Sequence, residues 1–427
     1  MTLFLTSFIV LMAIGLPIAL VLGGASLAYV LLKEGLSPTI IIQTTFAGLS
    51  SFPLLAIPLF ILAGNLMKEG GITADLVRFS RLLMGHIRGG LGLAMILASA
   101  LFAAITGSAV ATAVAIGSLL LPAMSSAGYD DEVSAALTAT AACMGPIIPP
   151  SIPFIIYGVI ANVSIASLFL AGIVPGILLG LALMVYMVWI ARKRGYPREE
   201  QASLPAILTG TVRALPALAL PVIIIGGILG GVFTPTEAAG IAVAYALIAG
   251  FCFYNRLRIS RLPGIFLTAG IESAAVMLLI GLSEPFAWIV AAEQLPTRIM
   301  EAIVNVSSSP WVFLILVNIL LLLIGIPLET APALTILTPV IAPVAVKMGI
   351  DPVHFGVVVC FNLVLGLITP PVGAVLFSIC SISGLSLERL SRGIWVPFLI
   401  AVGVLMLVTF VPALSTFLPQ LFAKPSP

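Results

Sequence analysis

Long stretches without a charged residue constrain this chain more than any other feature of its sequence. No Asp, Glu, Lys or Arg occurs in residues 89–129 or in residues 133–191. Of the 427 residues, 61% are hydrophobic and 8% are charged, whereas soluble domains carry roughly 25% charged residues. Because about 20 apolar residues suffice to span a bilayer, the sequence predicts an all-α polytopic membrane protein without a soluble domain.

Two of the apolar segments contain nearly the same break. Residues 145–151 read GPIIPPS, and residues 366–372 read GLITPPV. The two breaks are related by an offset of 221 in the numbering (366 − 145), and Gly128 and Gly349, which begin Gly-x-Asp turns upstream, share this offset (349 − 128). Proline removes a helical hydrogen bond, and unpaired carbonyls survive in a bilayer only where they are buried in protein or line a cavity. A matched pair of breaks therefore indicates the binding site of a secondary transporter.

A second pair of interruptions supports an internal repeat. Residues 106–108 (TGS) interrupt segment 91–122, and residues 325–330 (GIPLET) interrupt segment 311–346. We therefore expect a single transmembrane unit with two repeats, each a re-entrant hairpin plus broken helices. We expect the repeats to be inverted, because transporters with broken helices usually are. The expected ranges are 1–427 for the unit, 39–191 and 264–416 for the repeats, and 1–38 and 192–263 for scaffold helices.

The breaks offer a specific chemistry. A broken helix exposes carbonyl oxygens where its first half ends and amide hydrogens where its second half begins, which suits a small cation beside a carboxylate. Hard oxygen ligands favour sodium, whereas protons are the competing coupling ion, with Glu329 as the one relay candidate near a break. The predicted sodium ligands are Thr106, Gly107, Ser108, Gly145, Ile148, Gly325, Gly366 and Thr369. The predicted substrate-binding residues are Ser108, Pro150, Ser151, Glu329 and Pro371.

Other classes of function lack the residues they need. None of the five lysines follows a glycine, which excludes a phosphate-binding loop for ATP. The four cysteines and two histidines have no metal-ligand spacing. No aspartate lies between Asp131 and Asp351 to supply a catalytic pair, and the polar rings of a passive channel are missing. We therefore expect neither an enzyme nor a cofactor, with sodium only as the coupling ion.

Two acids stand out in apolar segment 264–292. Glu272 and Glu284 lie there without a neighbouring cation in the sequence, and an intramembrane acid is a functional candidate by default. Glu284 precedes Pro285, so this pair reads equally well as the tip of a hairpin near water. Both interpretations stay open at this point.

Residues 234–237 (TPTE) predict the start of a helix. Thr234 would be the N-cap, with proline at the first helical position and Glu237 at the third. A helix start after a tight turn explains this motif without any function.

The orientation of the chain depends on its basic loops. Residues 192–194 (RKR) and the arginines of residues 256–261 flank an antiparallel pair of segments, so both clusters can be cytoplasmic. Residues 68–88 are also basic, but three apolar segments separate them from residue 192. Either one of those segments is re-entrant, or the amphipathic helix at 76–83 lies on the outer interface.

Pro53 and Pro58 suggest a re-entrant hairpin in segment 39–67. The helix at 76–83 is either a brace for a moving domain or a cytoplasmic connector.

Several motifs, distributed from end to end, resemble the large membrane subunit of tripartite ATP-independent periplasmic (TRAP) transporters, the DctM-like family. They are IPPSIP at 148–153, IYG at 156–158, LFLAGIVPG at 168–176, FTPTEAA at 233–239, FAW at 286–288, EQLP at 293–296, ETA at 329–331 and LTP at 337–339.

The resemblance implies an elevator-type fold like that of the ion transporter superfamily, in the bacterial inner membrane. It also implies sodium-driven import of an organic acid, such as a C4-dicarboxylate, sialic acid or another sugar acid. The implied partners are a small four-helix membrane subunit, expected as a separate chain, and a periplasmic substrate-binding protein. The alternatives are a sodium- or proton-coupled anion carrier that works without a binding protein and, behind it, a membrane-embedded enzyme.

Overall fold

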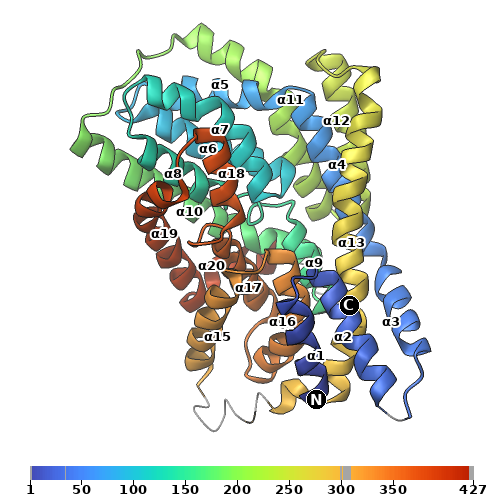
Figure 1. The fold of residues 1–427 in the computed structure, drawn as a ribbon. Coiled ribbons are helices and arrows are strands. Elements are labelled where there is room, and N and C mark those ends of the chain that lie inside the picture. Colours follow the sequence, from blue (N-terminus) through green and yellow to red (C-terminus); the bar gives the residue numbers. More distant parts are fainter. Residues whose placement is uncertain (1, 34, 299–300, 302–308, 423–427) are drawn as a thin grey trace.

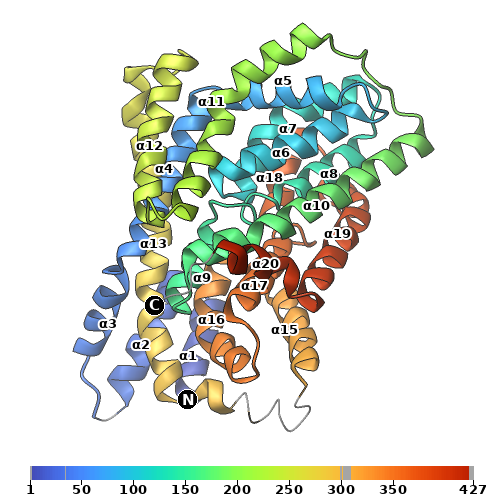
Figure 2. The same ribbon diagram turned by 180° about the vertical axis from the view of Figure 1, so that it is seen from behind.

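The computed structural model describes residues 2–33, 35–298, 301 and 309–422. The residues outside these ranges belong to the expected first scaffold segment, the second repeat and the C-terminus. The described part contains helices and no strand, and eight of its helical stretches are long and apolar enough to cross a membrane. Figures 1 and 2 show their arrangement. The elements are α1 (Thr2–Ala13), α2 (Ile18–Leu32), α3 (Thr39–Leu49), η1 (Phe52–Leu55), α4 (Ala56–Glu69), α5 (Ile72–Met84), α6 (Gly90–Thr106), α7 (Ala109–Ser126), α8 (Asp131–Ala142), α9 (Ile152–Ile160), α10 (Ile165–Arg194), α11 (Leu204–Leu229), α12 (Pro235–Ile248), η2 (Ala249–Phe253), η3 (Ile259–Arg261), α13 (Leu262–Ala292), α15 (Pro310–Gly325), α16 (Thr330–Lys347), α17 (Pro352–Gly366), α18 (Ala374–Ser383), α19 (Leu387–Phe410) and α20 (Ala413–Phe422).

The re-entrant hairpin expected at Pro53 and Pro58 is wrong. Helices α3 and α4 follow one another along the long helix α13, as both ribbon views show. Gly48 of α3 lies against Glu284, and Asn65 of α4 donates a hydrogen bond of 2.9 Å to Glu272. Both prolines fall in the first turn of a helical element, where the missing N–H would have no partner anyway. The chain therefore bends at these prolines without reversing.

The hairpin tip suggested at Glu284 and Pro285 is also wrong. Helix α13 runs through both residues without interruption. Membrane helices tolerate such a proline, because neighbouring helices shield the freed carbonyl from lipid.

Segment 91–122, expected as one broken helix, is a helical hairpin. Helices α6 and α7 pack against each other, and the chain reverses between them at Gly107 and Ser108. Gly107 has a left-handed φ of 62°, a conformation that glycine adopts without strain. Helices α15 and α16 also pack on each other around the second interruption, residues 326–329.

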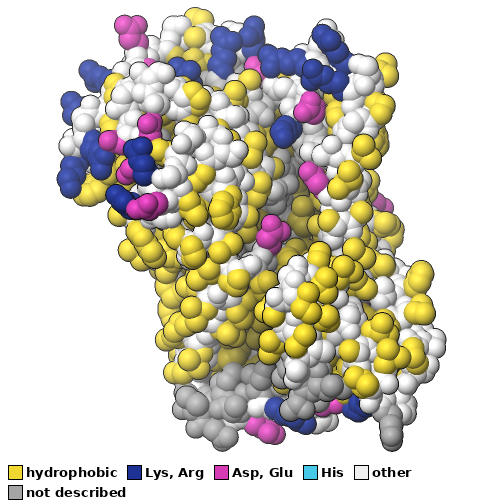
Figure 3. Space-filling view, in the orientation of Figure 1, with side chains coloured by type: hydrophobic (Ala, Val, Ile, Leu, Met, Phe, Trp, Pro, Cys, Tyr) yellow, Lys and Arg dark blue, Asp and Glu magenta, His cyan; other side chains and the backbone are white. Residues whose placement is uncertain are grey.

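This first hairpin resolves the orientation of the basic clusters. Glu199 forms an ion pair of 2.5 Å with Arg81, and its backbone N–H donates to the carbonyl of Gly85 at 2.9 Å. Arg256 donates to the carbonyl of Gly71 at 3.2 Å. All three clusters therefore lie on one face, seen at the top of Figure 3, with a broad apolar band below. The chain reversal between α6 and α7 agrees with the re-entrant alternative, and three clusters on one face do not fit an outer position of the amphipathic helix. The positive-inside rule predicts that this face is cytoplasmic, and entry of the hairpin into the membrane stays a prediction.

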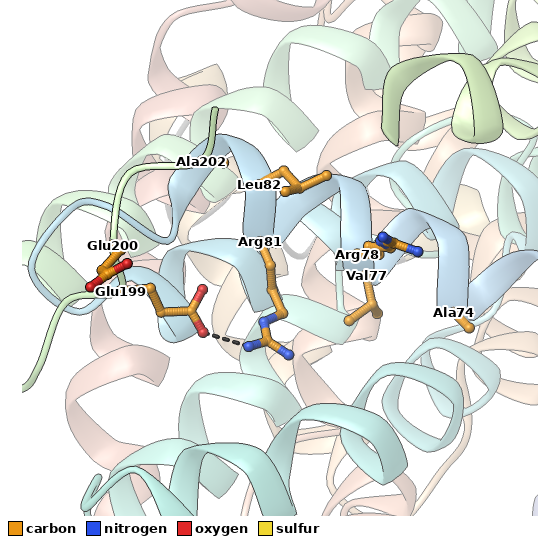
Figure 4. Close-up of a pocket in the computed structure, with 8 residues that line it drawn as sticks. All are labelled: Ala74, Val77, Arg78, Arg81, Leu82, Glu199, Glu200 and Ala202. Carbon is orange, nitrogen blue, oxygen red and sulfur yellow. Dashed lines mark hydrogen bonds and ion pairs between the residues drawn. The ribbon is translucent and has the colours of Figure 1, made fainter. Parts of the chain in front are cut away.

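Helix α5 is the amphipathic helix expected around residues 76–83. Leu76 and Val77 are buried against the protein, whereas Arg78 and Arg81 are exposed. Figure 4 shows these arginines on α5, with Arg81 paired to Glu199. The helix packs on both α6 and α11. It is thus a connector on the basic face, and its role as a brace stays a prediction.

The helix boundaries repeat at the offset found in the sequence. Helices α7 and α16 begin and end at positions related by an offset of 221 (330 − 109 and 347 − 126), and the starts of α8 and α17 share it (352 − 131). Each helix that follows a Pro-Pro loop packs on helices of the other half: α9 packs on α16 and α17, and α18 packs on α7 and α8. The two halves therefore interlock. Their inverted orientation and the division into repeats and scaffold stay predictions.

Candidate functional site

The first break and the tip of the first hairpin form one tightly packed unit. A Cβ atom on Gly145 would lie 2.7 Å from the carbonyl oxygen of Ser108, and one on Gly107 would lie 2.5 Å from that of Pro150. These glycines let two backbones approach at a distance no side chain would permit. The structure thus brings together four of the five residues predicted to bind sodium in this half, namely Thr106, Gly107, Ser108 and Gly145. The fifth, Ile148, belongs to the same break, but its side chain lies against Gly176 of α10.

Hydroxyl groups are already engaged at this tip. Ser108 is the N-cap of α7, and its side chain accepts a hydrogen bond of 3.3 Å from the N–H of Ala111. Thr112, one turn further along α7, donates to the carbonyl of Ser108 at 2.8 Å and lies 3.4 Å from the hydroxyl of Thr106. Thr112 was missed in the sequence, although its spacing of four from Ser108 places both on one helical face.

Ser151 has a capping role in this conformation. Its side chain is 0% exposed, donates to the carbonyl of Pro146 at 2.5 Å and accepts from the N–H of Phe154 at 3.3 Å. Pro150 beside it is buried as well. Binding of substrate by Ser151 and Pro150 therefore stays a prediction, and it would require this loop to open.

The second break is built in the same way around two other glycines. A Cβ atom on Gly366 would lie 2.4 Å from the carbonyl oxygen of Gly325. Helices α15 and α17 both end here, so the negative ends of two helix dipoles converge. Thr369 is buried, and its hydroxyl donates to the carbonyl of Leu365 at 2.8 Å. The three residues predicted to bind sodium in this half thus lie at the ends of α15 and α17.

A cavity of about 150 Å³ opens at the second break. Gly325, Glu329 and Gly366 line it together with Leu367 and Phe377. Glu329 is the exposed N-cap of α16, and Pro371 is exposed in the adjoining loop. An acid at the positive end of α16 is favourable for the helix, and it gives the cavity one negative charge. The apolar lining residues were not predicted, because the sequence argument searched for polar ligands.

The two breaks lie close to each other in the interior. The thiol of Cys143, just before the first Pro-Pro loop, is 3.8 Å from the carbonyl oxygen of Val364, its counterpart at offset 221. The cavity, however, is lined by residues of the second half. Of the five residues predicted to bind substrate, it includes Glu329, whereas Ser108, Pro150 and Ser151 belong to the first half.

A pair of buried asparagines, missed in the sequence, lies one turn behind the second break. Asn362 donates to the side-chain and backbone oxygens of Asn318 at 2.7 and 3.0 Å. Its own side-chain oxygen is buried without a partner among the described residues. Asn318 donates in turn to the carbonyl of Leu314 at 2.8 Å. These bonds hold α15 against α17, where Gly325 and Gly366 meet.

The available ligands suit a hard cation. Among the described residues, no three His, Cys, Asp or Glu side chains gather as a metal site. The break regions instead offer backbone carbonyls and the hydroxyls of Thr106, Ser108 and Thr369, which are sodium-type ligands.

Elsewhere, the helix start predicted at Thr234 is confirmed. Thr234 accepts from the N–H of Glu237 at 3.3 Å, and the Glu237 carboxylate accepts from the N–H of Thr234 at 2.8 Å. The motif thus has a structural role.

Comparison with known proteins agrees with this architecture. The family model of the DctM component of the tripartite ATP-independent periplasmic transporter matches residues 5–414. The sialic acid TRAP transporter large permease SiaM of Vibrio cholerae is 41% identical over 409 residues, covering 96% of each chain. The C4-dicarboxylate TRAP transporter large permease DctM of Rhodobacter capsulatus is 39% identical over 428 residues, covering 97% of each chain.

A solved structure has the same fold. The YdaH transporter of Alcanivorax borkumensis superposes with a TM-score of 0.68 at 15% identity and 90% coverage of both chains. Taken together, the sequence match, the fold and the apolar helices show that this chain belongs to the DctM family of TRAP transporters, as a multi-pass permease of the inner membrane and not an enzyme.

Proposed function

We propose that this permease couples inward sodium movement to the import of an organic acid. The observation that carries the proposal is the close backbone approach at both breaks, where a Cβ atom would lie 2.7 Å from the Ser108 carbonyl at Gly145 and 2.4 Å from the Gly325 carbonyl at Gly366. Each break places carbonyl ends of helices beside hydroxyl oxygens, so that a dehydrated sodium ion finds oxygen ligands without a carboxylate relay.

The substrate we propose is a carboxylic acid bound at the cavity of the second break. The relatives are named for sialic acid and for C4-dicarboxylates, and both classes carry carboxylates. Helix α16 begins at this cavity and α18 begins beside it, so two positive helix ends face the same space. Glu329 would repel a carboxylate at short range, so we propose that its charge supports the cation.

The proposed partners are a small membrane subunit and a periplasmic binding protein that delivers the acid. The family description names a tripartite, periplasmic transporter of which this chain type is one component. We further propose an elevator movement, in which the helices that carry the breaks shift against a frame. This frame consists of α2, α11 and α12 from the expected scaffold segments, together with α3, α4 and α13, which the sequence placed largely in the repeats. The continuous contact of α3 and α4 with α13 supports a rigid frame for such a movement.

Uptake by proteoliposomes that contain the permease and its small subunit tests sodium coupling. With the loaded binding protein outside, an inward sodium gradient should drive accumulation of the acid. Replacing sodium by choline at fixed pH should abolish it. Equal uptake in choline would contradict sodium coupling, and uptake driven by a pH gradient alone would favour protons. A panel of C4-dicarboxylates, sialic acid and other sugar acids then identifies the substrate.

A further inference from the structure

Two acids on helix α13 and one directly after it lie at three different depths. Glu293 follows its outer end, where Lys33 donates to the carboxylate at 2.7 Å and Tyr29 hydrogen-bonds the same oxygen. Glu272 lies 21 residues earlier (293 − 272), a rise of about 32 Å at 1.5 Å per residue. It is exposed and accepts a hydrogen bond from Asn65. These two acids are therefore about one hydrocarbon thickness apart, which is roughly 30 Å.

Glu284 lies between them, at mid-depth. It precedes Glu293 by nine residues (293 − 284), so it lies about 14 Å from the outer end of the helix. Its side chain is half-buried and passes over Gly48 of α3, where a Cβ atom would be 2.1 Å from its Cγ. Leu49 of α3 lies against Gly281 in the same way. The acid thus lies half-buried where two helices pack closely.

No cation of the described residues faces this carboxyl group. Within the same part of the chain, Glu284 has neither an ion pair nor a hydrogen-bond partner. The elements packed against α13 are α2, α3, α4, α16 and η3. Helices α2 and α3 contain no charged residue. The charged residues of the other elements lie at helix ends, namely Lys68, Glu69, Arg261, Glu329 and Lys347. Lys33, just after α2, and the titratable Tyr29 near its end are both bound to Glu293.

The helix itself offers this acid one acceptor. Pro285 has no N–H, and proline removes the helical bond to the carbonyl four residues earlier, which belongs to Gly281. A protonated carboxyl group can donate to such an oxygen, whereas a carboxylate only accepts. The hydroxyl of Thr45, on the face of α3 that carries Gly48 and one turn away, is also buried without a partner among the described residues. A hydroxyl both donates and accepts, so it can bond the acid in either protonation state.

We propose that Glu284 is a proton-binding site within the bilayer, whose carboxyl group is held in the protonated form where α3 crosses α13. An isolated carboxylate at mid-depth is costly, and neutralisation by a proton removes that cost without any other ligand. Deprotonation requires water or a cation to reach the crossing, so loss of the proton loosens α3 from α13.

Dicyclohexylcarbodiimide, an apolar reagent that reacts with protonated carboxyl groups, tests this assignment. Membranes that contain the transporter with its partners are treated at pH 7, and the peptide adducts are read by mass spectrometry. Glu284 should be labelled in the wild type and in the matched control Glu272→Gln, and the adduct should be lost in Glu284→Gln. No adduct at Glu284, while ATP synthase in the same membranes is labelled, would overturn the proposal.

Infrared difference spectra of purified wild type against Glu284→Gln provide a second readout that needs no access by a reagent. A protonated-carboxyl C=O band should be present in the wild type and missing from the variant. A carboxylate band in its place shows that Glu284 is ionised and paired, for example with a basic residue of a partner helix, and overturns the proposal. Neither readout involves transport, so the result is independent of whether sodium drives uptake.

Discussion

The two Pro-Pro breaks share their sequence pattern and their glycine contacts, yet they differ in how closed they are. At the first break, Ser151 is 0% exposed and bonded to Pro146 and Phe154. Its counterpart at offset 221, Val372, is 44% exposed beside a cavity of about 150 Å³. The N-caps differ likewise, because Ser108 caps α7 with its hydroxyl whereas Glu329 makes no capping bond to α16.

This difference indicates that the two similar halves have different roles. The first break is held by side-chain hydrogen bonds of Ser108, Thr112 and Ser151, so it resists rearrangement. The second break has an apolar, partly open loop and an exposed acid, so it can rearrange at lower cost. Apart from the two glycines whose backbone contacts both breaks share, we therefore expect substitutions at the first break to act mainly on stability and those at the second to act mainly on ligand binding.

The largest effect should come from the glycines shared by both breaks. Gly145→Ala and Gly366→Ala each place a carbon within 2.7 Å of a carbonyl oxygen, and such overpacking costs about 1–3 kcal/mol. We expect both to abolish uptake while the protein still inserts into the membrane. Gly403→Ala in α19, where a Cβ meets nothing within 4 Å, is the matched control. Normal uptake by Gly145→Ala alone would confine the transport site to the second break.

The second largest effect should distinguish the N-cap of α16, Glu329, from the N-cap of α7, Ser108. Glu329→Gln removes a charge at the cavity, and a unit charge a few ångströms away contributes about 1 kcal/mol even in a water-like dielectric. We therefore expect a roughly fivefold loss of apparent sodium affinity with little change in thermal stability. Ser108→Ala should instead lower the stability by about 1 kcal/mol.

Sodium titrations of uptake, paired with melting curves, check this prediction. An unchanged sodium titration with weaker substrate binding would assign Glu329 to the substrate. If both stay as in the wild type, Glu329 has no part in the mechanism.

Substitutions of the loop residues Ser151 and Val372 should differ less, in their effects on stability and on substrate binding. Ser151→Ala deletes the N-cap of α9 and should cost about 1 kcal/mol of the free energy of unfolding. Val372→Ala removes exposed apolar surface and should change stability by less than about 0.5 kcal/mol, but it should raise the KM for substrate. Equal destabilisation by both substitutions would show that the second loop is as rigid as the first.

The smallest effect concerns the two Gly-x-Asp turns. A hydrogen bond from Tyr196, together with Arg194 at 2.5 Å, holds the pKa of Asp130 below its ordinary value of 3.8. This stabilisation is present above pH 3.8 and is lost as the pH falls through the lowered pKa. Asp351, in contrast, accepts from the N–H groups of Val353 and His354 at 2.9 Å.

Asp130→Asn should therefore lower the free energy of unfolding at pH 7 by less than about 1 kcal/mol for so exposed a pair, which appears as a slightly lower melting temperature. The difference from wild type should vanish in acid below the lowered pKa. Melting curves across pH check this, and a difference that persists at the lowest pH would show that Tyr196 and Arg194 do not act through the charge of Asp130.

Local patterns were predicted well because their causes are local. The capping pair Thr234 and Glu237 depends on residues three apart, and the glycines at 145 and 366 mark backbone contacts that any side chain would block. Predictions failed where one pattern permits two chain paths. Pro53 and Pro58 fit a hairpin or a bend, and Glu284 with Pro285 fits a hairpin tip or a continuous helix. Only packing of α3 and α4 along α13 distinguishes these paths.

The sequence by itself determined that this chain lies in a membrane, that its helices break at positions matched by one constant offset, and that the breaks carry hydroxyl groups and backbone carbonyls. These follow from composition, from proline and from glycine, whose effects on the backbone need no tertiary context. The tertiary structure alone decided that residues 91–122 form a hairpin, that three basic clusters share one face, and that one break is closed while the other opens on a cavity. Those properties depend on which helices meet, and contacts between residues far apart in the chain settle that.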